Sequence, residues 1–217
     1  MVVTTTIQFV QLAILARYLP PADFGLMSIL MIVIGLSQIF IDLGISNAII
    51  HRQEISRNQL SSLYWLNLGT GTVLTVLLIA VSPWVAEFFE DDQLIEPLAV
   101  LSSVFIFTAV GSQYRILYQK VLEFEFLAKA DIAASFGALV FAVLLAIFGF
   151  GIYTLVVAVL ARAIIGSLLV TIPGLSRHHR PKLHCNILEV RSFLGFGAYQ
   201  LGERTINHIG ANIDKLI

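Results

Sequence analysis

The segment IYTLVVAVLARAIIGSLLVTIP, residues 152–173, decides the fold of this chain. It is almost wholly apolar and carries a single charge, Arg162, near its centre. A helix needs about 20 mainly apolar residues to cross the hydrocarbon core of a bilayer. A barrel strand would need only about 10 residues of alternating polarity, and this segment shows no sustained alternation. The segment is therefore predicted to be a membrane-spanning α-helix.

Similar apolar segments fill the rest of the chain. Of its 217 residues, 58% are hydrophobic and 12% are charged, and the mean hydropathy is +0.88. These values lie outside the usual range of soluble domains. Charged clusters and Pro- or Gly-containing turns separate six full spans, and a seventh follows them. We expect an all-α, polytopic membrane helical bundle with spans at residues 2–19, 24–50, 60–86, 97–118, 127–148, 152–173 and 192–217.

The basic residues are distributed unevenly between the two sets of alternate turns, and cytoplasmic turns of membrane proteins collect Lys and Arg. One set has only Arg17 as a basic residue and contains more acidic residues: Asp23, Glu90, Asp91, Asp92 and Glu96. The other set holds Arg52, Arg57, Arg115, Lys120, Lys129, Arg177, Arg180, Lys182 and Arg191. The turns at 51–59, 119–126 and 174–191 are therefore predicted to be cytoplasmic.

Arg162 is the deepest charge in the predicted bundle. At 1.5 Å per residue it lies about 15 Å from either membrane surface. Inserting a charge at that depth costs roughly 2.5 to 3.5 kcal/mol, so the side chain should face the protein interior, a partner acid or a water-filled cavity. Two interpretations are open. Arg162 either attracts an anion in a cavity or forms a structural ion pair with Asp42, Asp131 or Glu203.

Polar residues also form stripes on the predicted helices. In the last span, heptad-like spacing places Gln200, Glu203, Asn207 and Asp214 on one helical face, which Arg204 borders. Shorter stripes contain Thr4, Gln8 and Gln11, and Tyr64, Asn67 and Gly71. Such faces predict a shared hydrophilic lumen, with interhelical hydrogen bonding as the alternative. The candidate substrate-binding residues are Arg162, Gln200, Glu203, Arg204, Asn207, Asp42, Asn67, Gln8 and Gln11.

Catalytic and metal-binding patterns are weak in this sequence. The run HHRPKLHC, residues 178–185, has no spacing typical of a metal site and fits a basic turn against anionic lipid better. No GxxxxGK[ST] phosphate-binding motif occurs, so the chain does not carry its own ATPase. The predicted outer turns are too short to present acid and base residues. We therefore expect neither an enzyme nor a protein that holds a metal or another cofactor.

Three stretches of the chain resemble the bacterial polysaccharide flippases of the Wzx type. They are ARYLPPADFGLMSIL (16–30), DLGISNAIIHRQEISRNQLSSLYWLNLGTG (42–71) and YRILYQKVLEFEFLAKADI (114–132), with DFG and WLN as the most specific parts. These flippases belong to the multidrug, oligosaccharidyl-lipid and polysaccharide exporter superfamily. Such proteins usually have a strongly basic loop after the fourth helix, whereas Glu123 and Glu125 dilute the charge of that loop here.

The resemblance implies a transporter with two lobes around a central cavity. Residues 1–173 would form the N-terminal lobe, 174–191 a basic cytoplasmic linker between the lobes, and 192–217 the first helix of the second lobe. The chain would then be a fragment of a longer protein.

The cargo implied by the resemblance is an undecaprenyl-diphosphate-linked oligosaccharide for surface polysaccharide, such as lipopolysaccharide. Alternating access would carry it across the bacterial inner membrane, with H⁺ or Na⁺ as the coupling ion. Further expected partners are membrane lipids, a polysaccharide polymerase and a chain-length regulator, but no nucleic acid. The alternatives are an exporter of drugs or of another lipid-linked precursor, a membrane glycan polymerase or ligase, and a non-transporting assembly partner.

Overall fold

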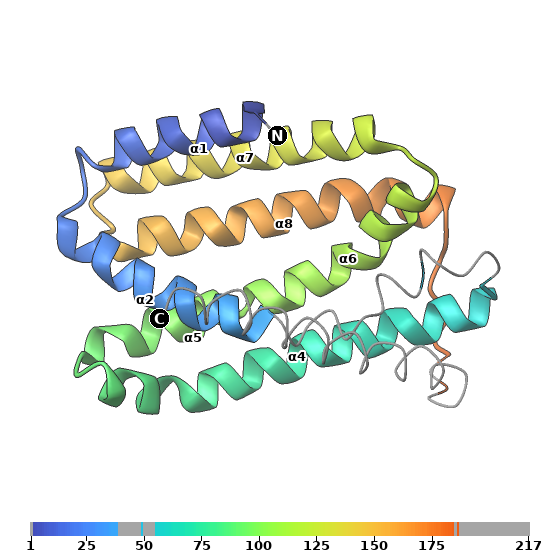
Figure 1. The fold of residues 1–217 in the computed structure, drawn as a ribbon, viewed down its shortest axis with the longest axis horizontal. Helices are drawn as coiled ribbons and strands as arrows, with labels where there is room; N and C mark the ends of the chain where they lie inside the picture. The colour runs from blue at the N-terminus through green and yellow to red at the C-terminus, as the bar shows by residue number, and fades with distance from the viewer. Residues whose placement is uncertain (1, 39–48, 50–54, 185, 187–217) are drawn as a thin grey trace, which may run out of the picture.

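A computed structural model describes residues 2–38, 49, 55–184 and 186, and Figure 1 shows them as a bundle of long helices. The elements are α1 (Val2–Leu15), α2 (Pro21–Gln38), α4 (Arg57–Phe88), the 3₁₀ turn η1 (Asp92–Leu94), α5 (Ile95–Ser102), α6 (Val104–Lys120), α7 (Phe124–Ile147) and α8 (Ile152–Arg177). No strand occurs among the described residues. The all-α fold is confirmed for this part of the chain.

The number of membrane spans differs from the predicted six plus the beginning of a seventh. Within the described residues, five helical segments are long and apolar enough to cross a membrane: α2, α4, the stretch Asp92–Lys120, α7 and α8. Helix α1 is shorter, with 14 residues, and the seventh predicted span lies outside the described residues. The chain is a multi-pass membrane protein.

The break between α1 and α2 explains why the first span is shorter than expected. After Leu15 the chain turns, with the amide of Tyr18 donating to the Leu15 carbonyl, and then enters Pro20 and Pro21. Proline cannot continue a helix, but its fixed φ suits the first helical position, which Pro21 occupies in α2. The second helix therefore begins before the predicted position 24.

Helix α8 holds the bundle together. It packs against α7, α6, α5 and α2, while α1 lies along α7 and α4 lies along α5 and α6 (Figure 1). The largest buried cluster among the described residues joins α2, α4, α5, α6 and α8 through residues such as Leu30, Leu78, Leu98, Phe105 and Val156. Large apolar side chains remain exposed on the outside of α4 and α7, including Val73, Val76, Phe136 and Phe141, as expected of a lipid-facing surface.

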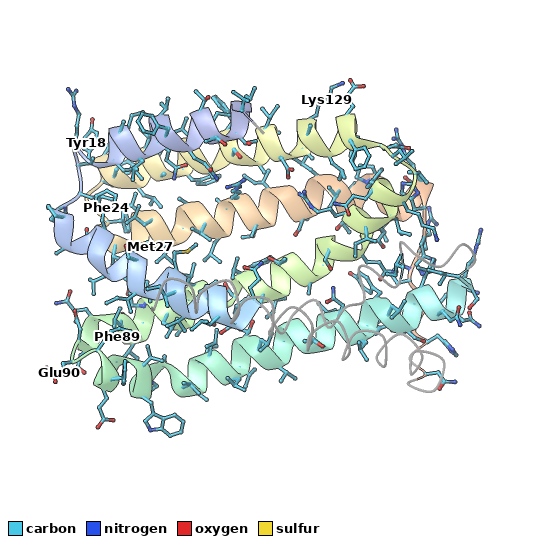
Figure 2. All side chains as sticks on the ribbon, viewed as in Figure 1. Tyr18, Phe24, Met27, Phe89, Glu90 and Lys129 are labelled. Carbon is cyan, nitrogen blue, oxygen red and sulfur yellow. The ribbon has the colours of Figure 1, made fainter. Side chains whose placement is uncertain are left out.

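Successive spans run in opposite directions, with α5 and α6 forming one span, so alternate turns lie at opposite ends of the bundle (Figure 1). The start of α4, the α6–α7 turn and the end of α8 lie at one end (Figure 1). Figure 2 shows Lys129 toward this end and Glu90 at the other. The two sets of turns distinguished by their basic residues are thus spatially separate, and the cytoplasmic assignment of the basic end stays a prediction.

The predicted span 97–118 contains a break at Ser103, which separates α5 from α6. The hydroxyls of Ser102 and Ser103 donate to the carbonyls of Ala99 and Val100, and Thr75 Oγ1 donates to the Ser102 carbonyl at 3.0 Å. Serine and threonine hydroxyls that bond to main-chain carbonyls compete with the helical ladder and bend helices. The hydroxyls therefore give a local cause for the break, which hydropathy cannot show.

Residues 178–184 and 186, called the strap below, follow α8 and lie against the first turns of α4. Trp65 Nε1 donates to the Lys182 carbonyl at 2.8 Å, and the Lys182 amide donates to Ser61 Oγ at 3.1 Å. Ser61 Oγ also lies 3.1 Å from His179 Nε2. The predicted linker began at residue 174, whereas α8 continues to Arg177 before the strap begins.

Candidate functional site

A central cavity of about 430 Å³ opens between α6, α7 and α8. Its walls combine polar and charged side chains with apolar and small ones. The polar lining residues are Gln38, Thr108, Ser112, Arg115, Asp131, Arg162 and Ser167. A cavity with such a lining inside a membrane bundle can hold a polar or anionic group that lipid would exclude.

Small residues shape the walls of the central cavity. At Gly111 a Cβ atom would come within 2.7 Å of Ser167 Oγ, so α6 and α8 approach each other more closely than any larger residue allows. Ser167 Oγ donates across this contact to the Phe107 carbonyl. Between α8 and α7 the packing is looser, since a Cβ atom at Gly166 would lie 3.6 Å from Ala134 Cβ, an ordinary van der Waals contact. The contacts at these points fix the helices, and their short side chains leave the neighbouring volume open.

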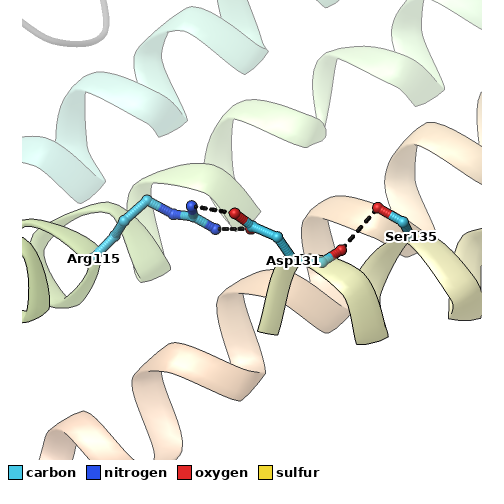
Figure 3. A network of polar contacts seen from close by, with 3 residues as sticks. All are labelled: Arg115, Asp131 and Ser135. Carbon is cyan, nitrogen blue, oxygen red and sulfur yellow. Dashed lines mark hydrogen bonds and ion pairs between the residues drawn. The ribbon is translucent and has the colours of Figure 1, made fainter. Parts of the chain in front are cut away.

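An ion pair between α6 and α7 lies on the wall of the central cavity (Figure 3). Arg115 Nη1 and Nη2 lie 3.1 and 2.5 Å from the two carboxylate oxygens of Asp131, a bidentate arrangement. The two side chains are 37% and 36% exposed, so the pair faces the hollow rather than a sealed core. Ser135 Oγ donates to the main-chain carbonyl of Asp131 at 2.8 Å and continues the contact along α7.

Arg162 lies half-buried on α8 between two cavities. Besides the central cavity it lines a second one of about 180 Å³, which α1, α2, α7 and α8 enclose. Gln8 and Gln11 from α1 line this second cavity together with Ser135. The structure therefore brings three of the candidate residues, Arg162, Gln8 and Gln11, around one space. Their role as substrate-binding residues stays a prediction.

The alternative for Arg162 was a structural ion pair. Asp131 pairs with Arg115 instead, and no carboxylate within residues 2–38 and 55–184 pairs with Arg162. The other two acids considered, Asp42 and Glu203, lie outside the described residues. So do the candidates Gln200, Arg204 and Asn207.

Asn67 has a packing role. It is buried, with 8% of its surface exposed, and its Nδ2 donates to the Ala109 carbonyl at 3.2 Å and to Ser112 Oγ. These bonds tie α4 to α6, and Asn67 lines neither of the two cavities. Interhelical hydrogen bonding, the alternative to a lumen, therefore describes Asn67.

Sequence reasoning treated Arg115 as a turn residue and Asp131 only as a partner for Arg162. Both lie on membrane-length helices and line the central cavity. A signal was available, because charged residues within an apolar span usually pair with one another inside the bundle. The pairing across 16 residues of sequence, however, depends on how α6 and α7 meet.

Residues 14–217 match the family described as polysaccharide biosynthesis protein. The chain is 34% identical over 98% of its length to the teichuronic acid biosynthesis protein TuaB of Bacillus subtilis, covering 44% of it. It is 32% identical over 96% of its length to the lipopolysaccharide biosynthesis protein WzxC of Escherichia coli, covering 42% of it.

A third relative is the succinoglycan biosynthesis transport protein ExoT of Rhizobium meliloti. The identity is 25% over 95% of this chain and 41% of ExoT. The chain thus spans less than half the length of these curated relatives. No solved structure matches the chain.

Proposed function

The chain belongs to the polysaccharide biosynthesis protein family, and from this premise we propose that it is the N-terminal lobe of a flippase for surface polysaccharide. The cargo would be an undecaprenyl-diphosphate-linked oligosaccharide, moved from the cytoplasmic to the outer leaflet of the bacterial inner membrane. Alternating access between two lobes would move it, with H⁺ or Na⁺ as the coupling ion. The names of WzxC, TuaB and ExoT, in lipopolysaccharide, teichuronic acid and succinoglycan biosynthesis, support a role in surface polysaccharide synthesis.

The position of Arg162 is the observation that supports the proposal most. A guanidinium binds phosphate oxygens in a bidentate manner, and it keeps its charge at any physiological pH. Arg162 borders both cavities, with the amides of Gln8 and Gln11 on one side and hydroxyl groups on the other. In this arrangement the guanidinium would hold the diphosphate, and the amides and hydroxyls would bond to sugar hydroxyls.

The lengths of the relatives support the division into lobes. The chain covers 41–44% of each of the three relatives above, which leaves room for a second helical lobe of similar size. In this proposal that lobe closes the cavities from the other side, and the strap and residues 187–191 lead into it. A polysaccharide polymerase, a chain-length regulator and membrane lipids are the proposed partners, and the transporter itself performs no catalysis.

Surface polysaccharide export by the full-length protein tests the role of Arg162. Export should be divided by the amount of protein in the membrane. We expect Arg162→Ala to lose about tenfold or more of its export per molecule, since charge-assisted bonds to phosphate are worth about 1.5 to 3 kcal/mol. Arg162→Lys should keep part of it, because lysine retains the charge but not the planar fork.

Arg17→Ala is the matched control, because it removes an exposed guanidinium from the α1–α2 turn, away from both cavities. It should export normally. Normal export per molecule by Arg162→Ala would contradict the role in cargo binding. A loss explained wholly by reduced protein in the membrane would instead assign Arg162 to the structure.

A further inference from the structure

We infer that Arg115 is a second phosphate ligand for the cargo, and that Asp131 occupies its guanidinium until the cargo arrives. The inference rests on the proposed function and adds a residue and a mechanism to it. It begins from the groups that share the central cavity. Among the residues that line it, two are cations, Arg115 and Arg162, and one is an acid, Asp131.

The Asp131 carboxylate binds the Arg115 guanidinium in the same bidentate geometry that a phosphate group would adopt. Arg115 directs Nη1 and Nη2 at the two oxygens of one carboxylate (Figure 3). The same fork binds two oxygens of a phosphate group. Asp131 therefore stands where a phosphate would bind and satisfies the guanidinium in its absence.

The exposure of the pair makes this exchange feasible. An ion pair that is open to solvent contributes only about 0 to 1 kcal/mol, whereas a sealed pair is costly to break. Arg115 and Asp131 each keep more than a third of their side chain exposed, and both line the central cavity. After displacement, water in the cavity can hydrate the Asp131 carboxylate, so its release does not leave a buried unpaired charge.

After the exchange the two guanidinium groups can pair one for one with the two phosphate groups of the proposed cargo. A diphosphate diester has one negative charge on each phosphate group. Arg162 alone would pair with one of these groups, and Arg162 with Arg115 would pair with both. Arg115 lies on α6, Asp131 on α7 and Arg162 on α8. The exchange would therefore replace an ion pair between α6 and α7 with a link between α6 and α8 through the bound diphosphate.

Binding of inorganic diphosphate to the purified full-length protein in lipid nanodiscs tests the inference. We expect Arg115→Gln to weaken binding about tenfold, the loss of roughly one charge-assisted interaction of 1.4 kcal/mol. Asp131→Asn should tighten binding by up to about fivefold, because it removes a competitor that is bound to the Arg115 fork only through a weak, open ion pair. In the double variant, Asp131→Asn should have no further effect, since the fork it frees is gone.

The double variant separates exchange from a general field effect. If Asp131 only lowers the positive potential of the cavity, Asp131→Asn will tighten binding equally with and without Arg115, which would overturn the inference. Unchanged or weaker binding by Asp131→Asn in a protein of normal thermal stability would overturn it as well. If Asp131→Asn does not fold, Asp131→Ser is compared in the same way.

Two further variants complete the experiment. Glu125→Gln removes the acid of the Glu125–Lys129 pair, which lies on the same helix α7 outside both cavities, and should leave diphosphate affinity unchanged. Arg162→Ala tests the proposed function separately. A loss of affinity in Arg162→Ala with none in Arg115→Gln would overturn the inference alone. Absence of diphosphate binding by the unaltered protein would overturn both.

Discussion

Arg162 and Asn67 show that the sequence reveals the membrane depth of a polar residue in an apolar helix but not its interaction partner. Sequence places both within membrane spans and indicates that neither should face lipid. The structure places Arg162 at two cavities and Asn67 in a contact between α4 and α6. The depth of a polar residue in the membrane could be predicted, because it follows from the number of residues between it and the ends of its span. Its partner could not, because that depends on which helix lies opposite.

The role of Asn67 leads to a prediction about stability. Asn67→Ala should lower the free energy of unfolding by about 1 to 3 kcal/mol, because it leaves the buried carbonyl of Ala109 without its interhelical donor. Thermal unfolding of the purified protein in detergent would measure this loss. Export per folded molecule should remain near normal, since Asn67 lines neither cavity.

Thr72→Ala is the control for this change, because Thr72 is exposed on the same helix and its hydroxyl bonds only to the Leu68 carbonyl in the preceding turn. It should unfold at nearly the same temperature as the unaltered protein. An Asn67→Ala protein as stable as Thr72→Ala would show that the α4–α6 bonds contribute nothing.

At the scale of the helices, the apolar cores of the spans could be predicted and their ends could not. Span 60–86 extends in the structure to Arg57–Phe88, because a capping box of Ser56 and Gln59 begins the helix within a polar stretch. The α7–α8 turn has Gly149 at φ 74°, a backbone conformation that glycine adopts without strain. Caps and turns thus set the ends, whereas hydropathy reports only the part within the membrane.

Packing between helices depends on particular glycines. At Gly71 on α4, a Cβ atom would come within 2.8 Å of the Phe105 carbonyl oxygen and 2.9 Å of Ala109 Cβ, neither of which can move without shifting α6. We therefore expect Gly71→Ala to destabilise the protein by about 1 to 3 kcal/mol, the usual cost of overpacking. Thermal unfolding of the purified protein in detergent would measure this loss.

Gly69→Ala provides the comparison within the same helix. Nothing lies within 4 Å of a Cβ at Gly69, so alanine adds only its better helix propensity, about 1 kcal/mol in favour of the folded state. The two substitutions should change stability in opposite directions. Equal stability of both variants would contradict the close packing of α4 on α6.

At the scale of the whole molecule, the strap joins the end of α8 to the start of α4. Its bonds to Ser61, Ser62 and Trp65 cross 117 to 124 residues of sequence. Most of them involve main-chain groups, which leave no pattern in the side chains of the strap. Sequence indicated only a basic loop at 174–191. The docking of that loop on α4 could not be predicted, because it depends on helix lengths that bring the end of α8 beside the start of α4.

His179 makes this docking sensitive to pH. Its side chain is 6% exposed and lies against Ser61, near Arg57 and Lys182. Burial, and then the charges of Arg57 and Lys182, lower the pKa of His179 below its ordinary value of 6.5. The docked strap therefore favours the neutral imidazole. The contribution of the neutral His179 to the stability of the docked strap is fully present above pH 6.5. It is lost as the pH falls through the lowered pKa of His179.

We expect the strap to leave α4 progressively as the pH falls below 6.5. Hydrogen exchange measured by mass spectrometry can follow this, because the Lys182 amide is protected by its bond to Ser61 Oγ. The protection factor, which corrects for the intrinsic effect of pH on exchange, should decrease in peptides from the strap and stay constant in peptides from α7. In His179→Gln the glutamine amide takes no proton, so the decrease should disappear. His178 and His184 remain in that variant, and persistence of the decrease would assign the pH dependence to them instead of His179.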